Sequence, residues 1–475
     1  MGRSILCLAV LCSASAATAQ DVYISIPATN IFNRSEFTTV QNVLNTGRHS
    51  NWRIGFLNSI DPTVRSLTND FTHTTHPTIK LPTEILEWRL ASIGGAHPPF
   101  KVFDVWPDFK YFVTRDQTWY QPFGTTGSYT AGNVAFTFKI PAKQYALHTF
   151  FAGNYSLAVT HNYGSSSFYA IEFTPNEFNV ILAVPAAVQW LSSSPAKYVE
   201  ISSLNPYRSS APVTFDLQKA ELGQTVDFNL MAKASSANIQ FTSSKGTAGT
   251  RPVSSIRLGT ANSVIPFIAL SDKWKNYTGA GAFNVAAGNR SRFQPQLSIT
   301  ATDLKNHFFQ AGTYSFQLNL DAKSTDNSIS APQNTDVILK VLPLSEITVP
   351  AAGQTVNFTF NTADSYRSGQ SRTIPNHLMV SNNENFEVYV KTDSEFFKAA
   401  GVQSDIRSGI LQLGVDGSTL VPLSITPQKI LSNAPPVLDR GLDIKYSISA
   451  GDAQNLIQKE KKVYSANVVY SFTAL

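Results

Sequence analysis

Three segments share a tyrosine-led pattern that constrains the fold more than any other feature of the chain. The last runs from Tyr464 to Val468 (YSANV), and its counterparts begin at Tyr155 (YSLAV) and Tyr314 (YSFQL). The intervals are 314 − 155 = 159 and 464 − 314 = 150 residues. They indicate that a unit of about 150 residues occurs three times. From Tyr464 onward apolar and polar residues alternate, which is the period of a half-buried β-strand.

Shorter matches in the same order support a duplication of the last two units. Gly223–Phe228 (GQTVDF) matches Gly353–Phe358 (GQTVNF), and Ile256–Gly259 (IRLG) matches Leu411–Gly414 (LQLG). The residues after the latter two, ANSVIPFIALSD and GSTLVPLSITPQ, are also alike. We therefore expect the second and third units to be close copies and the first to be a more divergent relative.

The same patterns predict an all-β chain of three tandem immunoglobulin-like β-sandwich domains. Short alternating segments separated by Gly, Pro and Asn are typical of such sandwiches. Ahead of them, a short apolar run ending in Ala-x-Ala predicts a cleaved signal peptide, and therefore export to the periplasm, the cell surface or the medium. The predicted boundaries are 1–19 for the signal peptide and 21–192, 205–342 and 343–475 for the three domains.

Composition narrows the possible chemistry. Both cysteines, Cys7 and Cys12, lie in the predicted signal peptide, so the mature chain has no thiol and no disulfide. Charged residues make up 15% of the chain and form no basic run, which argues against nucleic acid as a partner. His73 and His76 form the only close histidine pair, without a neighbouring acid, and we predict no metal and no cofactor. No apolar stretch is long enough for a transmembrane helix.

A dense aromatic stretch between residues 94 and 132 is the best candidate for a binding site. Aromatic rings stack on sugars, and nearby carboxylates bind hydroxyl groups; the candidate residues are Trp106, Trp119, Tyr120, Asp104 and Asp108. The alternative is that the rings form the core of a large sandwich, since aromatic side chains bury much area. We favour core packing over sugar binding.

The leader, the strand rhythm and the tyrosine-rich final strand together resemble bacterial surface and pilus subunits of the chaperone–usher and spore-coat-protein-U kind. In that family the final strand is bound by a chaperone, and a sheet edge is completed by a neighbour's strand. The resemblance implies that an assembly strand here carries Tyr464, Val468, Tyr470 and Phe472, with envelope subunits or a periplasmic chaperone as partners. The same strand also has a second interpretation, in which it only closes its own domain.

These observations predict a secreted, non-enzymatic envelope protein with a structural, adhesive or assembly role. The alternative is a carbohydrate-binding protein that uses the aromatic first domain. A third possibility is a glycan hydrolase, which would need two carboxylates facing each other across a cleft. No catalytic motif in the sequence identifies such a pair.

Overall fold

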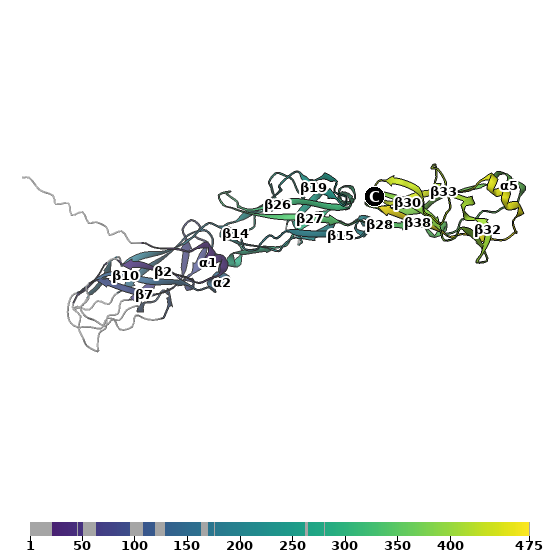
Figure 1. Ribbon diagram of the computed structural model, residues 1–475. Helices are drawn as coiled ribbons and strands as arrows, with labels where there is room; N and C mark the ends of the chain where they lie inside the picture. The colour runs from purple at the N-terminus through teal and green to yellow at the C-terminus, as the bar shows by residue number, and fades with distance from the viewer. Residues whose placement is uncertain are drawn as a thin grey trace, which may run out of the picture.

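The computed structural model contains three β-rich lobes that follow one another in a row (Figure 1). Among the described residues, the apolar side chains form three hydrophobic clusters, one in each lobe. The all-β fold class is confirmed, while the predicted signal peptide lies outside the described residues. The structure describes residues 21–44, 46–50, 63–95, 108–118, 129–162, 170–174, 176–261, 265–279 and 281–474.

The first lobe packs two sheets around buried aromatic rings. Trp88 stacks on Phe112 with ring centroids 5.5 Å apart, and both side chains are buried. One sheet has the order β1 (Val22–Ser25), β13 (Glu177–Val184), β11 (Gly153–Asn162), β4 (Thr63–Ser66) and β9 (Gln117–Thr118), with β5 (Asp70–His73) on β11 and β6 (Lys80–Pro82) on β5. The other contains β12 (Ala170–Thr174), β3 (Thr46–Ser50), β10 (Tyr129–Ile140), β7 (Glu87–Gly95) and β8 (Lys110–Tyr111), with β2 (Phe37–Leu44) on β10.

The second lobe repeats this arrangement. Its larger sheet has the order β15 (Lys197–Ile201), β27 (Ser330–Val341), β26 (Gly312–Ser324), β18 (Phe228–Ala234) and β23 (Lys275–Asn276), with β19 (Asn238–Ser243) on β26 and β20 (Ala248–Pro252) on β19. Two smaller sheets complete the lobe: β16 (Val213–Asp216), β25 (Pro295–Ile299), β21 (Ile256–Thr260), β22 (Ile268–Ala269), and β14 (Val188–Trp190), β17 (Ala220–Gln224), β24 (Arg290–Phe293).

The third lobe contains counterparts of most of these strands. One sheet has the order β28 (Ser345–Thr348), β29 (Gln370–Asn382), β36 (Val437–Ile448), β33 (Leu411–Val415) and β34 (Val421–Pro422). The others are β35 (Gln428–Ala434), β30 (Phe386–Thr392), β38 (Val468–Ala474), and β32 (Val402–Arg407), β31 (Phe396–Ala399), β37 (Tyr464–Ser465).

Short helices occupy the same two places in every lobe. One follows the first strand, or the segment that stands in its place: α1 (Ala28–Asn33), α3 (Asn205–Arg208) and α5 (Ala363–Ser368). The other precedes the tyrosine-led strand: α2 (Gln144–Leu147), α4 (Ala301–His307) and α6 (Ala450–Asn455). This recurrence gives the three lobes a common chain path.

The three tyrosines that define the repeat lie in equivalent positions. Each hydroxyl donates to the carbonyl four residues earlier, at 3.1 Å from Tyr155, 2.7 Å from Tyr314 and 2.9 Å from Tyr464. Each tyrosine also pairs with a strand in an equivalent position: Tyr155 with β5, Tyr314 with β19 and Tyr464 with β31. A tyrosine that bonds back to the chain just upstream is a hallmark of immunoglobulin-like sandwiches. The structure therefore confirms this equivalence.

Two other expectations from the sequence are changed by the structure. The match of Gly223–Phe228 with Gly353–Phe358 joins segments in different places, because the first ends in β18 while the second precedes α5 and belongs to no strand. In addition, β14 lies within the range 21–192 predicted for the first domain, yet it pairs with β17 of the second lobe. The IRLG and LQLG match does hold, since β21 pairs with β22 as β33 pairs with β34.

Candidate functional site: an open sheet edge in the third lobe

The tyrosine-led strand has a different neighbour in the third lobe. In the first lobe β13 runs antiparallel to β11 and parallel to β1, and in the second β27 runs antiparallel to β26 and parallel to β15. In the third lobe β38 pairs with β30 along one side, and no described strand pairs with its other side. The outer edge of β38 therefore presents unpaired backbone groups.

Burial along this strand shows that a covering layer is missing. Subtracting the repeat interval of 150 places Val468, Tyr470 and Phe472 at the positions of Leu318, Leu320 and Ala322. Leu318, Leu320 and Ala322 are buried, whereas Val468, Tyr470 and Phe472 are half-buried. The pairing to the central strand is the same in both lobes, so the added exposure comes from the open side.

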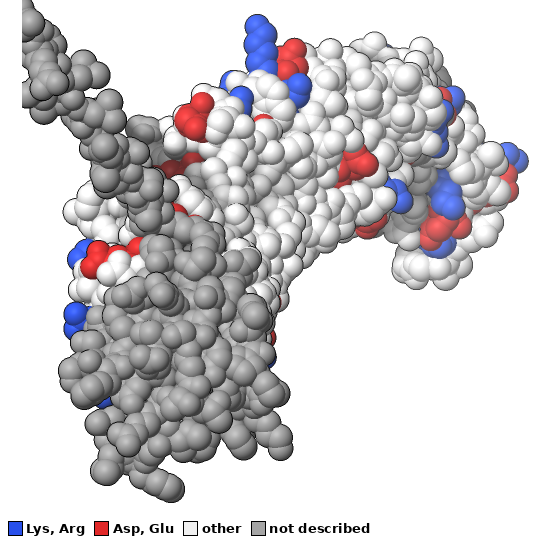
Figure 2. Space-filling model, turned by 90° about the vertical axis from the view of Figure 1, so that its left-hand side faces the viewer, with Lys and Arg blue, Asp and Glu red and all other residues white. Residues whose placement is uncertain are grey.

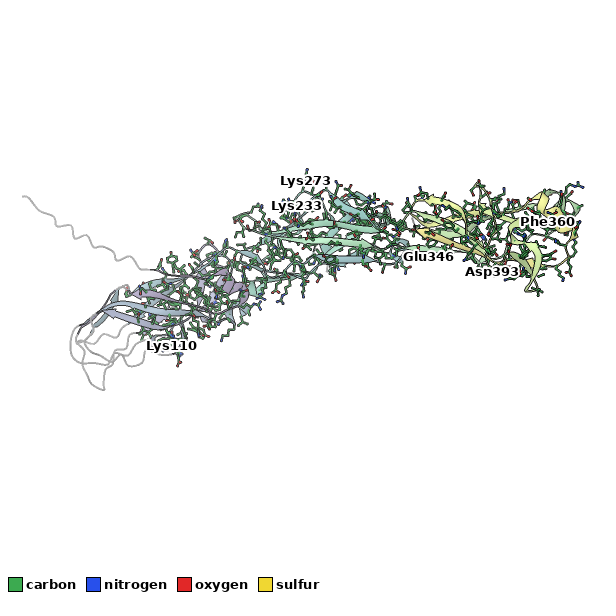
Figure 3. The ribbon with its side chains drawn as sticks, in the orientation of Figure 1. Lys110, Lys233, Lys273, Glu346, Phe360 and Asp393 are labelled. Atoms are coloured by element: carbon green, nitrogen blue, oxygen red, sulfur yellow. The ribbon has the colours of Figure 1, made fainter. Side chains whose placement is uncertain are left out.

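A second row of apolar residues lies in the third lobe at the place in the chain that β1 takes in the first lobe and β15 in the second. Residues 355–361 precede α5, as β1 precedes α1 and β15 precedes α3. Within this segment Val356, Phe358 and Phe360 alternate with exposed polar residues, are half-buried and pack against the third cluster (Figure 3 labels Phe360). No backbone–backbone hydrogen bond joins the segment to another described residue. We call β38 and residues 355–361 together the two apolar rows.

Two hydrogen bonds in series fix Tyr470 of β38 on the side that faces the core. The Tyr470 hydroxyl lies 2.5 Å from the Tyr446 hydroxyl, which lies 2.7 Å from His377 Nε2. Burial raises the pKa of Tyr446 to about 12 and lowers the pKa of His377. Burial also raises the pKa of Tyr470, so all three groups are neutral near pH 7, and the hydrogen bonds hold Tyr470 without placing a charge beside the apolar row.

Three of the four predicted assembly residues lie in the apolar row of β38, namely Val468, Tyr470 and Phe472. Tyr464 instead lies in β37, where it forms the tyrosine turn described above. Tyr446 and His377 were not among the residues predicted from the sequence, because neither belongs to a motif.

Most of the predicted sugar-binding residues lie outside the described residues: Trp106, Trp119, Tyr120 and Asp104. Asp108 is exposed and raises the pKa of Lys110, although burial has the larger effect and lowers it. Among described aromatics of the same stretch, Phe112 belongs to the core, and Phe109 has the Lys139 ammonium 4.1 Å from its ring centroid. Sugar binding in this lobe stays a prediction.

The charges are dispersed over the surface that Figure 2 shows, where Lys and Arg lie in small groups beside Asp and Glu. In the described part of the chain, no group of three or more His, Cys, Asp or Glu is placed to hold a metal ion. No helix there is both long and apolar enough to cross a membrane.

Comparison with known proteins finds no matching family model and no matching curated protein sequence. Among solved structures, the chain is similar to the CFA/I adhesin CfaE of enterotoxigenic Escherichia coli, with 11% identity over 68% of this chain and 98% of that one and a TM-score of 0.29. The CooA pilin subunit of the same organism has 12% identity, 34% and 100% coverage and a TM-score of 0.24.

The CupB6 tip adhesin of Pseudomonas aeruginosa is also similar, with 7% identity over 64% of this chain and 90% of that one and a TM-score of 0.24. A further neighbour is the periplasmic chaperone SfaE, with 10% identity over 60% of this chain and 98% of that one and a TM-score of 0.15. Pilus subunits, adhesins and chaperones are also the kinds of protein that the sequence resembles.

Proposed function

We propose that the chain is an exported structural or adhesive subunit of a bacterial envelope fibre, and that its third lobe joins the fibre by accepting a β-strand from a neighbouring chain. The open edge of β38, with its half-buried apolar row, carries this proposal. An unpaired edge beside apolar side chains is a template for strand addition. The proposal gives the chain no catalytic role.

The incoming strand can be described from the two lobes that already have it. Because β13 and β27 run antiparallel to the tyrosine-led strand, we expect the partner strand to run antiparallel to β38 and parallel to residues 355–361. In β27 the residues opposite Leu318, Leu320 and Ala322 are Thr335, Gln333 and Ala331, and the buried Val337, Leu339 and Val341 continue the same face toward the tyrosine; we expect the partner strand to present a face of this kind at every second position. A periplasmic chaperone could occupy the same edge before assembly.

The proposal takes the mature chain as three domains, for which the sequence predicted the bounds 21–192, 205–342 and 343–475. The first two lobes would be carried outward by the third. Because β14 pairs with β17, the proposal moves the limit between the first two domains from residue 192 to residues 185–187, between β13 and β14.

The test supplies the missing strand from within the protein. Residues 325–341, which form the turn and the covering strand of the second lobe, are appended after Leu475. Because the open edge would then be paired and its apolar row covered, we expect the third-lobe melting temperature to rise by about 10 °C or more.

The matched control carries Val337→Ser and Leu339→Ser within the appended copy, so that length and backbone are kept while the apolar face is lost. This control should give little stabilisation. If the unaltered appended strand leaves the melting temperature unchanged, the edge of β38 is not an acceptor site and the proposal is wrong.

A further inference from the structure

An Arg-Ser pair marks the same place in every lobe. Arg34 follows α1, Arg208 ends α3 and Arg367 lies in the last turn of α5, and each is followed by serine. The helices occupy equivalent positions in the chain path of their lobes. The three arginines can therefore be compared directly.

Two of these arginines bind the lobe that follows. Arg34 Nη2 donates to the Gly288 carbonyl at 3.3 Å, and this bond joins the first lobe to the second. Arg208 Nη2 donates to Asp439 Oδ1 at 2.7 Å and to Glu346 Oε1 at 2.9 Å in the third lobe (Figure 3 labels Glu346). Pairing with Arg208 lowers the pKa of Asp439.

The backbone repeats the same contact at both junctions. Ala152 N–H donates to the Thr225 carbonyl at 2.8 Å, and Ala311 N–H donates to the Asn383 carbonyl at 3.1 Å. Both alanines lie three residues before the tyrosine of their lobe. Each lobe therefore receives the next one on the end that holds its tyrosine turn and its Arg-Ser pair.

In the third lobe this end is uncovered. The side chain of Arg367 is 78% exposed and has Asp364, itself 88% exposed, at 3.8 Å. Figure 1 places α5 and β32 at the end of the third lobe that is remote from the second. Between the β31–β32 hairpin and the chain before Tyr464 lies a hollow of about 450 Å³. Two valines at this end, Val402 and Val463, are 71% and 86% exposed.

The hairpin beside this hollow has a counterpart in the second lobe that contacts the next lobe. There the corresponding hairpin, β19–β20, carries Ser244, whose hydroxyl donates to the Glu384 carboxylate of the third lobe. Glu384 follows Asn383, the residue that accepts the bond from Ala311. In the second lobe this end thus contacts a turn of the next lobe, through Ser244 and Ala311.

We propose that the free end of the third lobe docks the folded body of the subunit that supplies the added strand, with Arg367 paired to carboxylates on that body. This inference rests on the proposed function. In the first two lobes the covering strand leads within a few residues into the next lobe, from β13 to β14 and from β27 to β28. A strand added in the same direction delivers its own domain to the end that holds Arg367.

The partner's chemistry follows from the junction already present. We infer an immunoglobulin-like domain with acidic residues at the positions of Glu346 and Asp439 and a turn that enters the hollow. Lys461 is at the same end; its ammonium contacts the Tyr366 hydroxyl at 3.0 Å and no carboxylate among the described residues. It adds positive charge that favours an acidic face.

The experiment repeats residues 325–475 after Leu475, which adds the covering strand and then a second copy of the third lobe. That copy brings its own Glu346 and Asp439 to the original Arg367. Docking is measured as the rate at which proteinase K cuts the second 342–344 linker. Arg367→Glu in the original lobe should raise that rate about three- to tenfold, the range for an exposed to partly buried ion-pair network.

Two controls separate the causes. Arg257→Glu, at an exposed position of β21, should leave the cleavage rate unchanged. Glu346→Lys with Asp439→Lys in the appended copy should restore slow cleavage to Arg367→Glu. If Arg367→Glu has no effect although the appended strand stabilises the original third lobe, the docking inference is wrong and the proposed function stands. If the appended strand does not stabilise that lobe, both are wrong.

Discussion

Removing the side chain of Asn289 should loosen the junction between the first two lobes. Asn289 is fully buried, and its amide accepts from the Phe150 N–H at 2.8 Å. The same amide donates to the Phe150 carbonyl at 2.8 Å and to the Gln224 carbonyl at 2.6 Å. One side chain therefore satisfies a donor and two acceptors, on both sides of the junction.

The cost of Asn289→Ala can be estimated from these bonds. Each buried backbone group left without a partner costs about 1–3 kcal/mol, and part of this is recovered when water enters the junction, so we expect a loss of about 3–5 kcal/mol. Asn289 also has φ of 56°, a left-handed conformation that an alanine adopts at a cost of about 1 kcal/mol. Asn327→Ala is the matched control, because Asn327 has φ of 63° in an exposed turn, where its N–H donates to the Ser324 carbonyl of the same lobe.

Hydrogen exchange of the peptide that contains Phe150 provides the readout. Without Asn289 the Phe150 amide loses its acceptor, and its exchange should accelerate about 100-fold or more, as expected from the free-energy loss. Urea unfolding of the first two lobes should show the same loss. If Asn289→Ala unfolds within about 1 kcal/mol of Asn327→Ala and leaves Phe150 protected, the asparagine does not hold the junction.

Three further outcomes follow from single residues. Burial lowers the pKa of His161 from 6.5 to about 3, so the unfolded chain binds more protons between these values. The first lobe should therefore lose stability as pH falls from 6.5 to 3, by up to about 1.4 kcal/mol per pH unit, and His161→Phe should flatten this dependence in acid titrations followed by circular dichroism. Tyr314→Phe should cost about 1–2 kcal/mol in urea unfolding and Tyr464→Phe less, because only the former is fully buried. Gly312→Ala should cost more than either in the same assay, since its φ is 150° and a Cβ would lie 2.3 Å from the Thr242 carbonyl oxygen.

The tyrosine-led strands were predictable because their signal is local. Alternation of apolar and polar residues sets which side of a strand is buried, and the tyrosine hydroxyl bonds to a carbonyl only four residues away. Residues that fix such a strand lie within one short stretch of sequence. For this reason Tyr155, Tyr314 and Tyr464 could be aligned without knowing any long-range contact.

The two apolar rows were not predictable to the same degree. Strand pairing joins backbone N–H and C=O groups, which are alike in nearly all residues, so the sequence does not say which strands will pair. Residues 355–361 alternate as convincingly as Phe228–Ala234, yet the latter is paired on both sides and the former on neither. The same limitation explains the misleading match between GQTVDF and GQTVNF. Likewise Tyr446 and His377 come together from β36 and β29 through sheet packing that no sequence spacing encodes.

The size of the inward-facing residues on β38 explains how the third lobe can fold with an open edge, which under the proposed function still gains from a partner strand. Tyr470 and Phe472 replace the Leu320 and Ala322 of β26, so larger side chains fill part of the space that a covering strand encloses in the second lobe. The bond from Tyr470 to Tyr446 fixes the bulkiest of them, which limits collapse of the row into the core. These substitutions act on side-chain packing alone and leave the outer amides and carbonyls of β38 unpaired. The larger side chains thus maintain the fold. They cannot satisfy the unpaired backbone groups at the edge of β38, and under the proposed function an added strand would do so.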